Sequence, residues 1–242
     1  MSFLQLLFLA FVQAVSEFLP ISSSGHLNLF QSIFGLTPSL VLDIFLNTAT
    51  LFSVFYIFRH QFRDFLKKIP LIFIGTLPAA ILGFLFKDKI DLLFTRPDYL
   101  PLFFLITSVL LLAQKFITPK KSELTPVKAL IIGLFQALAL LPGVSRSAST
   151  LFAGLLLGLP LLQAFQFSFY LFIPASLGAL VLNFTDISLL SSFISLESLL
   201  AFLFAFIVGI ISLRLLQKLF THRHLWYFAF YTLALSVILF FF

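Results

Sequence analysis

Ten apolar stretches, separated by short polar or basic breaks, constrain the fold of this chain more than any other feature. They lie at residues 3–14, 25–35, 39–58, 69–86, 100–117, 127–140, 148–158, 162–183, 194–216 and 225–242. Of the 242 residues, 61% are hydrophobic and only 10% are charged, so too few polar side chains remain to cover a soluble surface. The sequence predicts an all-α integral membrane protein that forms a single membrane domain over residues 1–242.

Segment length separates full membrane spans from shorter helices, because a span needs about 17–25 apolar residues. Six segments reach that length, namely 39–58, 69–86, 100–117, 162–183, 194–216 and 225–242. The other four segments are shorter and form two pairs, and each pair flanks a Ser-rich polar break. Non-helical backbone at membrane depth is tolerated only inside protein or beside a water-filled cavity. We therefore predict two re-entrant helical hairpins whose tips are the polar breaks.

The two hairpins resemble each other in sequence. Residues 11–26 read FVQAVSEFLPISSSGH, and residues 134–149 read LFQALALLPGVSRSAS. At one constant offset, Gln13 aligns with Gln136, and Ser22 aligns with Ser145. This similarity predicts an internal repeat.

The repeat would comprise residues 1–118 and 127–242, each copy a hairpin followed by three full spans. Because a copy then crosses the membrane an odd number of times, the second copy must be inverted relative to the first. Inverted repeats with broken helices are a known way to build a polar site near the bilayer midplane.

Loop charges predict how the chain is oriented. Eleven of the 15 Lys and Arg residues lie in the loops at 59–68, 115–128 and 214–224, which share one face in the inverted arrangement. The positive-inside rule places that face in the cytoplasm. Because the basic residues are scattered between apolar segments and form no continuous patch, we expect no nucleic-acid partner.

Three charged residues have no role in topology, namely Glu17, Asp43 and Arg146. A charge inside the hydrocarbon region costs about 2.5–3.5 kcal/mol on insertion scales, so it is expected to be functional or paired. Glu17 and Arg146 lie on the two tips. Asp43 heads a long apolar segment, where an interfacial or helix-capping role remains open. Asn47, one turn later, is expected either to hydrogen-bond across helices or to contact a ligand.

The tips together predict one buried polar site. Its members would be Glu17, Ser22, Ser23, Ser24, His26, Ser145, Arg146 and Ser147. Arg146 offers a planar fork of donors, while serine hydroxyls and the backbone N–H groups of the Ser/Gly turns, at Gly25 and Gly143, add more. This excess of donors points to phosphate or diphosphate. His26 exchanges a proton near neutral pH and could assist a serine nucleophile or a leaving phosphate.

An acid that faces a phosphate needs a proton or a cation between them. Gln13 and Glu17 are four residues apart and share a helical face, so they are the predicted ligands of a divalent cation such as Mg²⁺ or Ca²⁺.

Blander interpretations compete with this site. A Ser run in a membrane helix often only satisfies backbone or glues helices, and Arg146 could snorkel toward an interface. The architecture also suits a transporter or flippase of an anionic lipid, which needs only binding groups. Ser23 together with His26 favours an enzyme, because a site for turnover needs a nucleophile and a proton donor. A purely structural protein would leave Glu17 and Arg146 unexplained.

The stretches QAVSEFLPISSSGHL and PGVSRSAST resemble the two signature motifs of the undecaprenyl-diphosphate phosphatases of the bacitracin-resistance type. DIFLNTATL, residues 43–51, is similar to a third, weaker segment of that family. The resemblance implies a multi-pass phosphatase of the bacterial cytoplasmic (inner) membrane, with its site toward the outer face. It would remove the terminal phosphate of undecaprenyl diphosphate and so recycle the lipid carrier for peptidoglycan synthesis.

The resemblance also implies residue roles. The family's catalytic positions fall on Glu17, Ser23, His26 and Arg146, with dependence on a divalent cation. We expect Arg146 to hold the diphosphate and Ser23, or a water in its place, to attack. His26 would assist proton transfer, and Glu17 would bind the metal or act as the base. The expected substrate-binding residues are Ser22, Ser24, Gly25, Asn47, Gly143, Ser145 and Ser147. Gln13 stands where some members have Glu, and Asn47 departs from the family's usual His. Membrane lipids are the other expected partners, and the oligomeric state is left open, a homodimer included.

Overall fold

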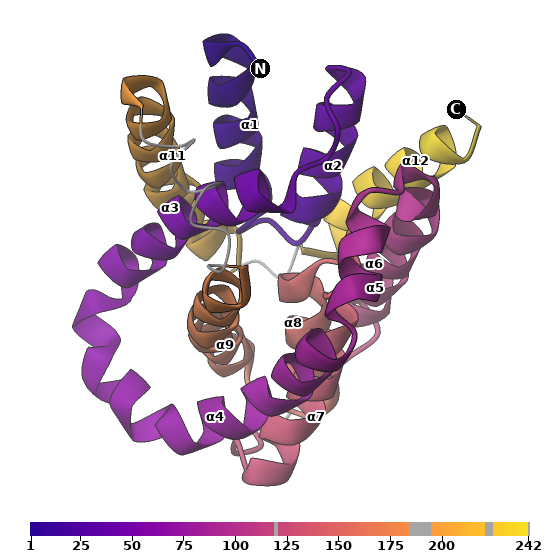
Figure 1. The fold of residues 1–242 in the computed structure, drawn as a ribbon. Helices are drawn as coiled ribbons and strands as arrows, with labels where there is room; N and C mark the ends of the chain where they lie inside the picture. Colours follow the sequence, from indigo (N-terminus) through magenta and orange to yellow (C-terminus); the bar gives the residue numbers. More distant parts are fainter. Residues whose placement is uncertain (119–120, 184–194, 221–224, 242) are drawn as a thin grey trace.

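The protein is described here by a computed structural model of residues 1–118, 121–183, 195–220 and 225–241, in which all regular structure is helical (Figure 1). The helices are α1 (Phe3–Ser16), α2 (Ser23–Ile33), α3 (Leu40–Phe58), α4 (Phe62–Leu85), α5 (Lys87–Phe94), α6 (Leu100–Gln114), α7 (Pro126–Leu138), α8 (Arg146–Leu156), α9 (Leu161–Asn183), α11 (Leu196–Phe220) and α12 (Phe228–Phe241). Short 3₁₀ turns occur at η1 (Arg59–Gln61), η2 (Pro97–Tyr99) and η3 (Leu225–Tyr227). Each predicted apolar segment corresponds to one of these helices. The ends of the segments at 194 and 242, and the loop charges of Lys120, Asp186 and Arg223, lie outside the described residues.

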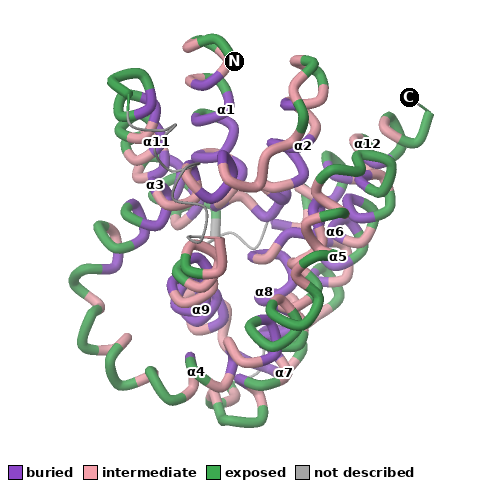
Figure 2. The backbone as a smooth tube through the Cα atoms, viewed as in Figure 1, coloured by how far each residue is buried: buried purple, intermediate pink, exposed green. Residues whose placement is uncertain are grey.

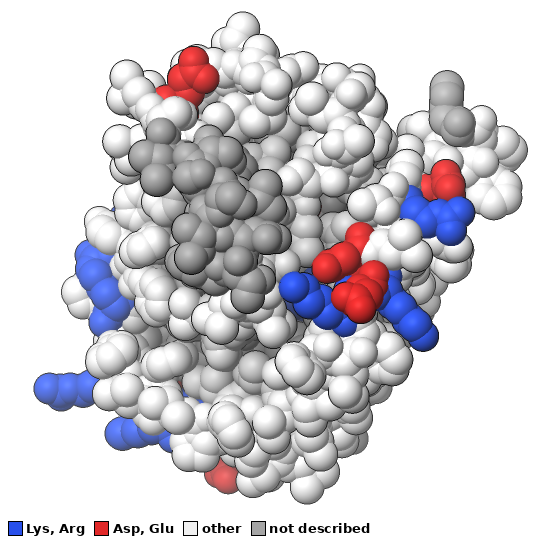
Figure 3. All heavy atoms as spheres, in the orientation of Figure 1, with Lys and Arg blue, Asp and Glu red and all other residues white. Residues whose placement is uncertain are grey.

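The helix α5 was not expected from the sequence. Four of its residues, KDKIDLLF, are charged, so by hydropathy alone the stretch is typical of a loop. The backbone nevertheless continues as a helix after Phe86 and ends at Thr95. In Figure 3 a mixed group of acidic and basic side chains gathers on the right, over α5.

The helices of the two predicted hairpins are short, as expected. α1, the longest of the four, has 14 residues and α8 has 11, whereas the hydrocarbon core is about 30 Å thick. At a rise of about 1.5 Å per residue, even α1 reaches only about 21 Å. α1 packs against α2, and α7 packs against α8. These helices are thus too short to cross a bilayer and instead end at the polar tips.

Within the described residues, four stretches are long and apolar enough to span a membrane: Leu40–Leu85, Pro97–Gln114, Leu161–Asn183 and Leu196–Leu219. The first contains two of the six predicted spans, joined by the 3₁₀ turn η1, with α3 ending at Phe58 and α4 beginning at Phe62. The polar residues at 59–61 thus separate the two helices. The last predicted span is shorter, at Leu225–Phe241. The number of crossings and their orientation stay predictions.

The two halves of the chain exchange packing partners. α4 lies along α7, α11 lies along α1, and α6 packs against α12 (Figure 1). The contact between α4 and α7 is close enough for the backbones to meet, because a Cβ on Gly133 would overlap the carbonyl of Gly75. Two related halves packed about a common axis would give such an exchange, and the inverted repeat itself stays a prediction.

Buried side chains gather around the middle of the molecule, while the outer faces carry large exposed apolar residues (Figure 2). Phe84, for example, is 69% exposed, and Phe73 and Phe116 are exposed as well. A soluble monomer rarely exposes so much contiguous apolar surface. These outer faces are suited to contact with lipid, whereas the polar tips lie in the buried centre of the molecule.

Candidate active site

The two hairpin tips meet backbone to backbone. A Cβ on Gly25 would lie 2.8 Å from the Cα of Gly143, and Gly143 has a φ of +105°, in the region that favours glycine. Both glycines are therefore needed for close packing of the tips. We expected them to bind substrate, but the structure places them at the junction of the tips, outside the set of residues that line the cavity described below.

Serine caps begin both inner helices. Ser22, with the unusual φ of +70°, precedes α2, and its hydroxyl accepts a hydrogen bond from the Gly25 amide at 3.4 Å. Ser145 precedes α8, and its hydroxyl accepts from the Ala148 amide at 3.3 Å. Each helix keeps further N-terminal amides that have no partner within the helix. Such amides attract anions, and here two helices begin at one place.

The second tip is anchored by Thr107 of α6. Its hydroxyl donates to the Gly143 carbonyl at 2.8 Å and accepts from the Ser145 amide at 2.9 Å. The sequence offered no signal for this contact, because Thr107 lies inside an otherwise apolar helix. The anchoring fixes the turn immediately before Arg146.

Glu17 and Arg146 form an ion pair between the tips. Arg146 Nη2 lies 3.0 Å from Glu17 Oε1, and the side chains are 13% and 11% exposed. Arg146 Nη1 also donates to the Ser168 carbonyl at 3.1 Å, and the guanidinium lies 4.2 Å from the centre of the Phe172 ring. The structure thus brings the Glu17 carboxylate and the Arg146 guanidinium together, and residues of α9 hold the Arg146 side chain in place.

Ser23 lies beside the same carboxylate. Its hydroxyl donates to Glu17 Oε2 at 2.6 Å. A nucleophile within about 2.6–3.2 Å of a base has the geometry needed for activation. The base that this structure places beside Ser23 is therefore Glu17.

His26 faces another direction. Its side chain is 3% exposed, with Nδ1 lying 2.7 Å from the Ser22 carbonyl and Nε2 lying 2.7 Å from the Tyr231 hydroxyl. A carbonyl only accepts, so Nδ1 carries a proton, and Nε2 of the neutral ring accepts from Tyr231. His26 is not among the residues that line the cavity. Its expected part in proton transfer stays a prediction.

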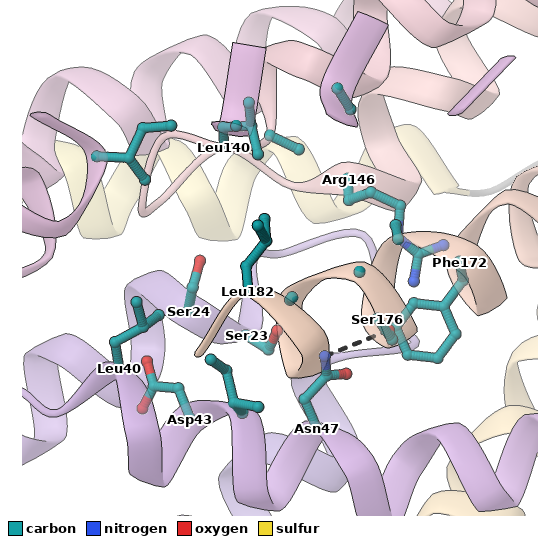
Figure 4. A pocket seen from close by; sticks show the side chains of 18 of the residues that line it. Ser23, Ser24, Leu40, Asp43, Asn47, Leu140, Arg146, Phe172, Ser176 and Leu182 are labelled. Atoms are coloured by element: carbon teal, nitrogen blue, oxygen red, sulfur yellow. Dashed lines mark hydrogen bonds between the residues drawn. The ribbon is translucent and has the colours of Figure 1, made fainter. Parts of the chain in front are cut away.

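A cavity of about 520 Å³ opens beside the tips (Figure 4). The predicted site residues that line it are Gln13, Glu17, Ser22, Ser23, Ser24, Asn47, Ser145, Arg146 and Ser147. Apolar side chains, including Phe84, Leu140, Phe172 and Leu182, form other parts of its wall. Its volume is in the range of small-molecule sites, about 300–1,000 Å³, so the cavity can hold a polar headgroup between apolar walls.

The amide of Gln13 turns its nitrogen toward Glu17. Its Nε2 lies 3.1 Å from Glu17 Oε2 and 3.4 Å from Thr50 Oγ1. The carboxylate can only accept, and the one proton of Thr50 is donated to the Asn47 carbonyl. Gln13 therefore presents a donor to Glu17, and its role as a cation ligand stays a prediction. Within the described residues, no group of three or more His, Asp or Glu could enclose an ion.

Asp43 is a site residue whose role the sequence left open. It lines the cavity, is 8% exposed, and accepts at Oδ1 from Gln31 Nε2 at 3.0 Å. The signal was its charge inside an apolar segment, but an interfacial or capping role was equally compatible. Ser39, and not Asp43, caps the start of α3. Asn47 lies one turn further along, and its Nδ2 donates to Ser176 Oγ at 3.3 Å.

Sequence comparisons cover nearly the whole chain. The family model described as bacitracin resistance protein BacA matches residues 6–238. A curated undecaprenyl-diphosphatase from Thermosipho africanus is 38% identical over 96% of this chain and 97% of its own length. Relatives of the same name from Methanobrevibacter smithii (34% identical, covering 99% and 97%) and Treponema denticola (37% identical, covering 98% and 96%) are similar. The matched region includes both hairpins.

Proposed function

Because the chain belongs to the bacitracin resistance protein BacA family, we propose that it is a membrane phosphatase that hydrolyses undecaprenyl diphosphate to undecaprenyl phosphate and inorganic phosphate. This activity recycles the lipid carrier for peptidoglycan synthesis and is consistent with bacitracin resistance. The observation that carries the proposal is the contact of Ser23 and Arg146 with one carboxylate, Glu17, at the junction of two helix N-termini.

Binding of the diphosphate falls to the donors around Arg146. A guanidinium has five N–H donors, and two of its nitrogens are engaged here with Glu17 and the Ser168 carbonyl. When phosphate oxygens arrive, the guanidinium exchanges part of its contact with Glu17 for a charge-assisted contact with the substrate. That exchange leaves the Glu17 carboxylate hydrogen-bonded to Ser23.

The chemical step then follows from the contact of Ser23 with Glu17. The Ser23 oxygen attacks the terminal phosphorus, and its proton passes to Glu17 Oε2. The bond from that phosphorus to the bridging oxygen breaks, and undecaprenyl phosphate leaves with the bridging oxygen. Glu17 gives this proton to the leaving undecaprenyl phosphate and so becomes a base again. It then takes a proton from a water that attacks the phosphoserine. The bond from phosphorus to the Ser23 oxygen breaks, Ser23 regains a proton from Glu17, and inorganic phosphate is released. In the alternative route, Glu17 activates a water that attacks phosphorus directly, and Ser23 only orients it.

The lipid tail is accommodated by the apolar part of the cavity wall, at residues such as Phe84 and Leu140. Apolar walls cost a hydrocarbon chain nothing when it leaves the bilayer. The distribution of basic loops supports a site open toward the outer face of the cytoplasmic membrane. A homodimer stays a prediction.

A transporter or flippase of a polyprenyl phosphate is the rival function. Its support is the architecture, because paired broken helices from two halves of a chain are common in transporters. A binding site alone has no need of a hydroxyl 2.6 Å from a carboxylate. The contact between Ser23 and Glu17 therefore favours the phosphatase.

Phosphate release by the purified protein from undecaprenyl diphosphate tests the proposal, measured in detergent with and without a chelator. We expect the wild-type protein to release phosphate and Glu17→Gln to release none. Measuring the transbilayer movement of labelled lipid in liposomes would distinguish the phosphatase from a transporter or flippase. Lipid movement without phosphate release, or equal release by Glu17→Gln, would refute the phosphatase proposal.

A further inference from the structure

Two oxygen acceptors on α3 have no hydrogen-bond donor among the described residues. Asp43 is 8% exposed, and its Oδ2 has no hydrogen-bond partner among the described residues. Asn47 Oδ1 is buried, and it too has no partner there. Buried polar atoms are almost always hydrogen-bonded, so each exception calls for an explanation. The two residues are four apart and rise from one face of α3 toward Ser23 and Ser24 (Figure 4).

The charges around the cavity do not balance once a diphosphate is bound. Arg146 is neutralised by Glu17, whereas Asp43 has no ion pair among the described residues. Lys87 also lines the cavity, but its Nζ donates to the Leu182 carbonyl at 3.1 Å. A diphosphate brings further negative charge into this space. Unpaired buried charge costs several kcal/mol, so a cation or a proton must accompany the substrate.

We propose that Asp43 and Asn47 bind a divalent cation together with the diphosphate, at a position distinct from Glu17 and Gln13. This inference rests on the proposed substrate. Mg²⁺ is typically held by one or two carboxylates plus substrate phosphates and water, with no dedicated protein cage. The described residues match that pattern, since they contain no cluster of three acidic or His ligands. To reach the cation, the Asn47 oxygen would rotate about χ2, which is a soft torsion in Asn, and Nδ2 would give up its contact with Ser176 Oγ.

Distances along α3 separate this position from the ion pair. Thr50 contacts Gln13, which contacts Glu17. Asp43 lies seven residues before Thr50, which is about 10 Å along a helix axis, and Asn47 lies between them. Both Glu17 oxygens already accept donors from the protein. A diphosphate can thus bridge from the donors at Arg146 to a cation at Asp43 and Asn47.

Binding of Mn²⁺, followed by the loss of the free-ion EPR signal, tests the site independently of turnover. The protein is used in detergent with methylenediphosphonate, which is not hydrolysed. We expect wild type to bind Mn²⁺ more tightly with the diphosphonate than without it. Asp43→Asn should weaken binding by at least about tenfold. Asn47→Asp should strengthen it, because it adds a carboxylate, and a gain cannot arise from misfolding.

Glu17→Gln is the control for the position of the ion, and it should retain Mn²⁺ binding within about threefold. Two results would overturn the proposal. One is unchanged Mn²⁺ binding by Asp43→Asn. The other is loss of Mn²⁺ binding by Glu17→Gln while Asp43→Asn still binds Mn²⁺ normally. The first result would mean that Asp43 is protonated and donates to the diphosphate. If the wild-type protein releases no phosphate but its Mn²⁺ binding depends on Asp43, the proposed phosphatase function is wrong and the cation site is supported. If it releases phosphate but Asp43→Asn does not change Mn²⁺ binding, only the proposed cation site is wrong.

Discussion

The carboxylate of Glu17 and the guanidinium of Arg146 make a contact of 3.0 Å between residues that are 129 positions apart in the chain. Each residue lies on a different hairpin tip, so the pair closes the junction between the two halves of the protein. Because both side chains are mostly buried, the pair affects stability as well as chemistry. The two effects can be separated experimentally.

Arg146→Ala should lower phosphate release by roughly 100-fold or more, because it removes the donors that face the developing charge. Arg146→Lys should not restore it, because a point charge cannot replace a planar fork. Arg146→Ala should also lower the free energy of unfolding by about 3–5 kcal/mol, since it strands the Glu17 carboxylate. The double variant Glu17→Gln with Arg146→Met should recover stability but not activity. Near-normal turnover by Arg146→Lys would contradict the assignment.

Ser23→Ala should reduce phosphate release by about 100-fold or more, because the hydroxyl that donates to Glu17 is lost. Ser32→Ala is the matched control, since Ser32 lies on the same helix outside the cavity and its hydroxyl donates to the Asn28 carbonyl at 3.0 Å. We expect the control to stay within about fivefold of wild type. Trapping of phosphate on the protein after an acid quench distinguishes the two routes. A Ser23→Ala enzyme with high activity would make water the attacking group.

Tyr231→Phe should destabilise the protein by about 1–3 kcal/mol, because it leaves His26 Nε2 buried without a donor. Thermal unfolding in detergent measures the change. If the role of His26 is to hold the Ser22 carbonyl and so fix the shape of the first hairpin tip, Tyr231→Phe should raise KM as well as lower activity, because the tip would be less well ordered for binding substrate. A fall in kcat alone, with unchanged stability, would instead indicate that His26 transfers a proton.

Gly133→Ala should destabilise the fold by about 1–3 kcal/mol, because a Cβ there would overlap the backbone of Gly75 and push α7 away from α4. Gly178→Ala is the comparison, since a Cβ at that helical position meets no atom within 4 Å. It should leave the unfolding temperature unchanged or raise it slightly. Equal stability of the two variants would show that the contact between α4 and α7 is looser than described.

Much of the fold could be predicted because lipid leaves few choices. Apolar runs of limited length must be helices whose backbone bonds are satisfied internally. That constraint gave the ten segments, including the four short ones at the polar breaks. It failed at α5, where charged residues within a helix resemble a loop. Local hydropathy reports the environment of a segment and not the hydrogen bonding of its backbone.

The composition of the site was also readable, because charges such as Glu17 and Arg146 have no other reason to lie within the membrane. Their pairing was not readable. Either His26 or Glu17 could have been the base for Ser23. The structure places Ser23 against Glu17, and His26 contacts Tyr231, 205 residues away. Gln13 was expected to offer an oxygen, but its neighbours accept and so select its amide nitrogen.

The sequence by itself determined that this chain is a helical membrane protein with two polar tips and an acid, a base and serines at those tips. The identity of residues and their spacing along a helix are local properties, and they carry that information. Only the tertiary structure decided which groups touch, that Gly25 and Gly143 join the tips, and that Asp43 faces the cavity. These outcomes depend on how helices pack and on which donors and acceptors remain unused, and neither is a property of a single segment.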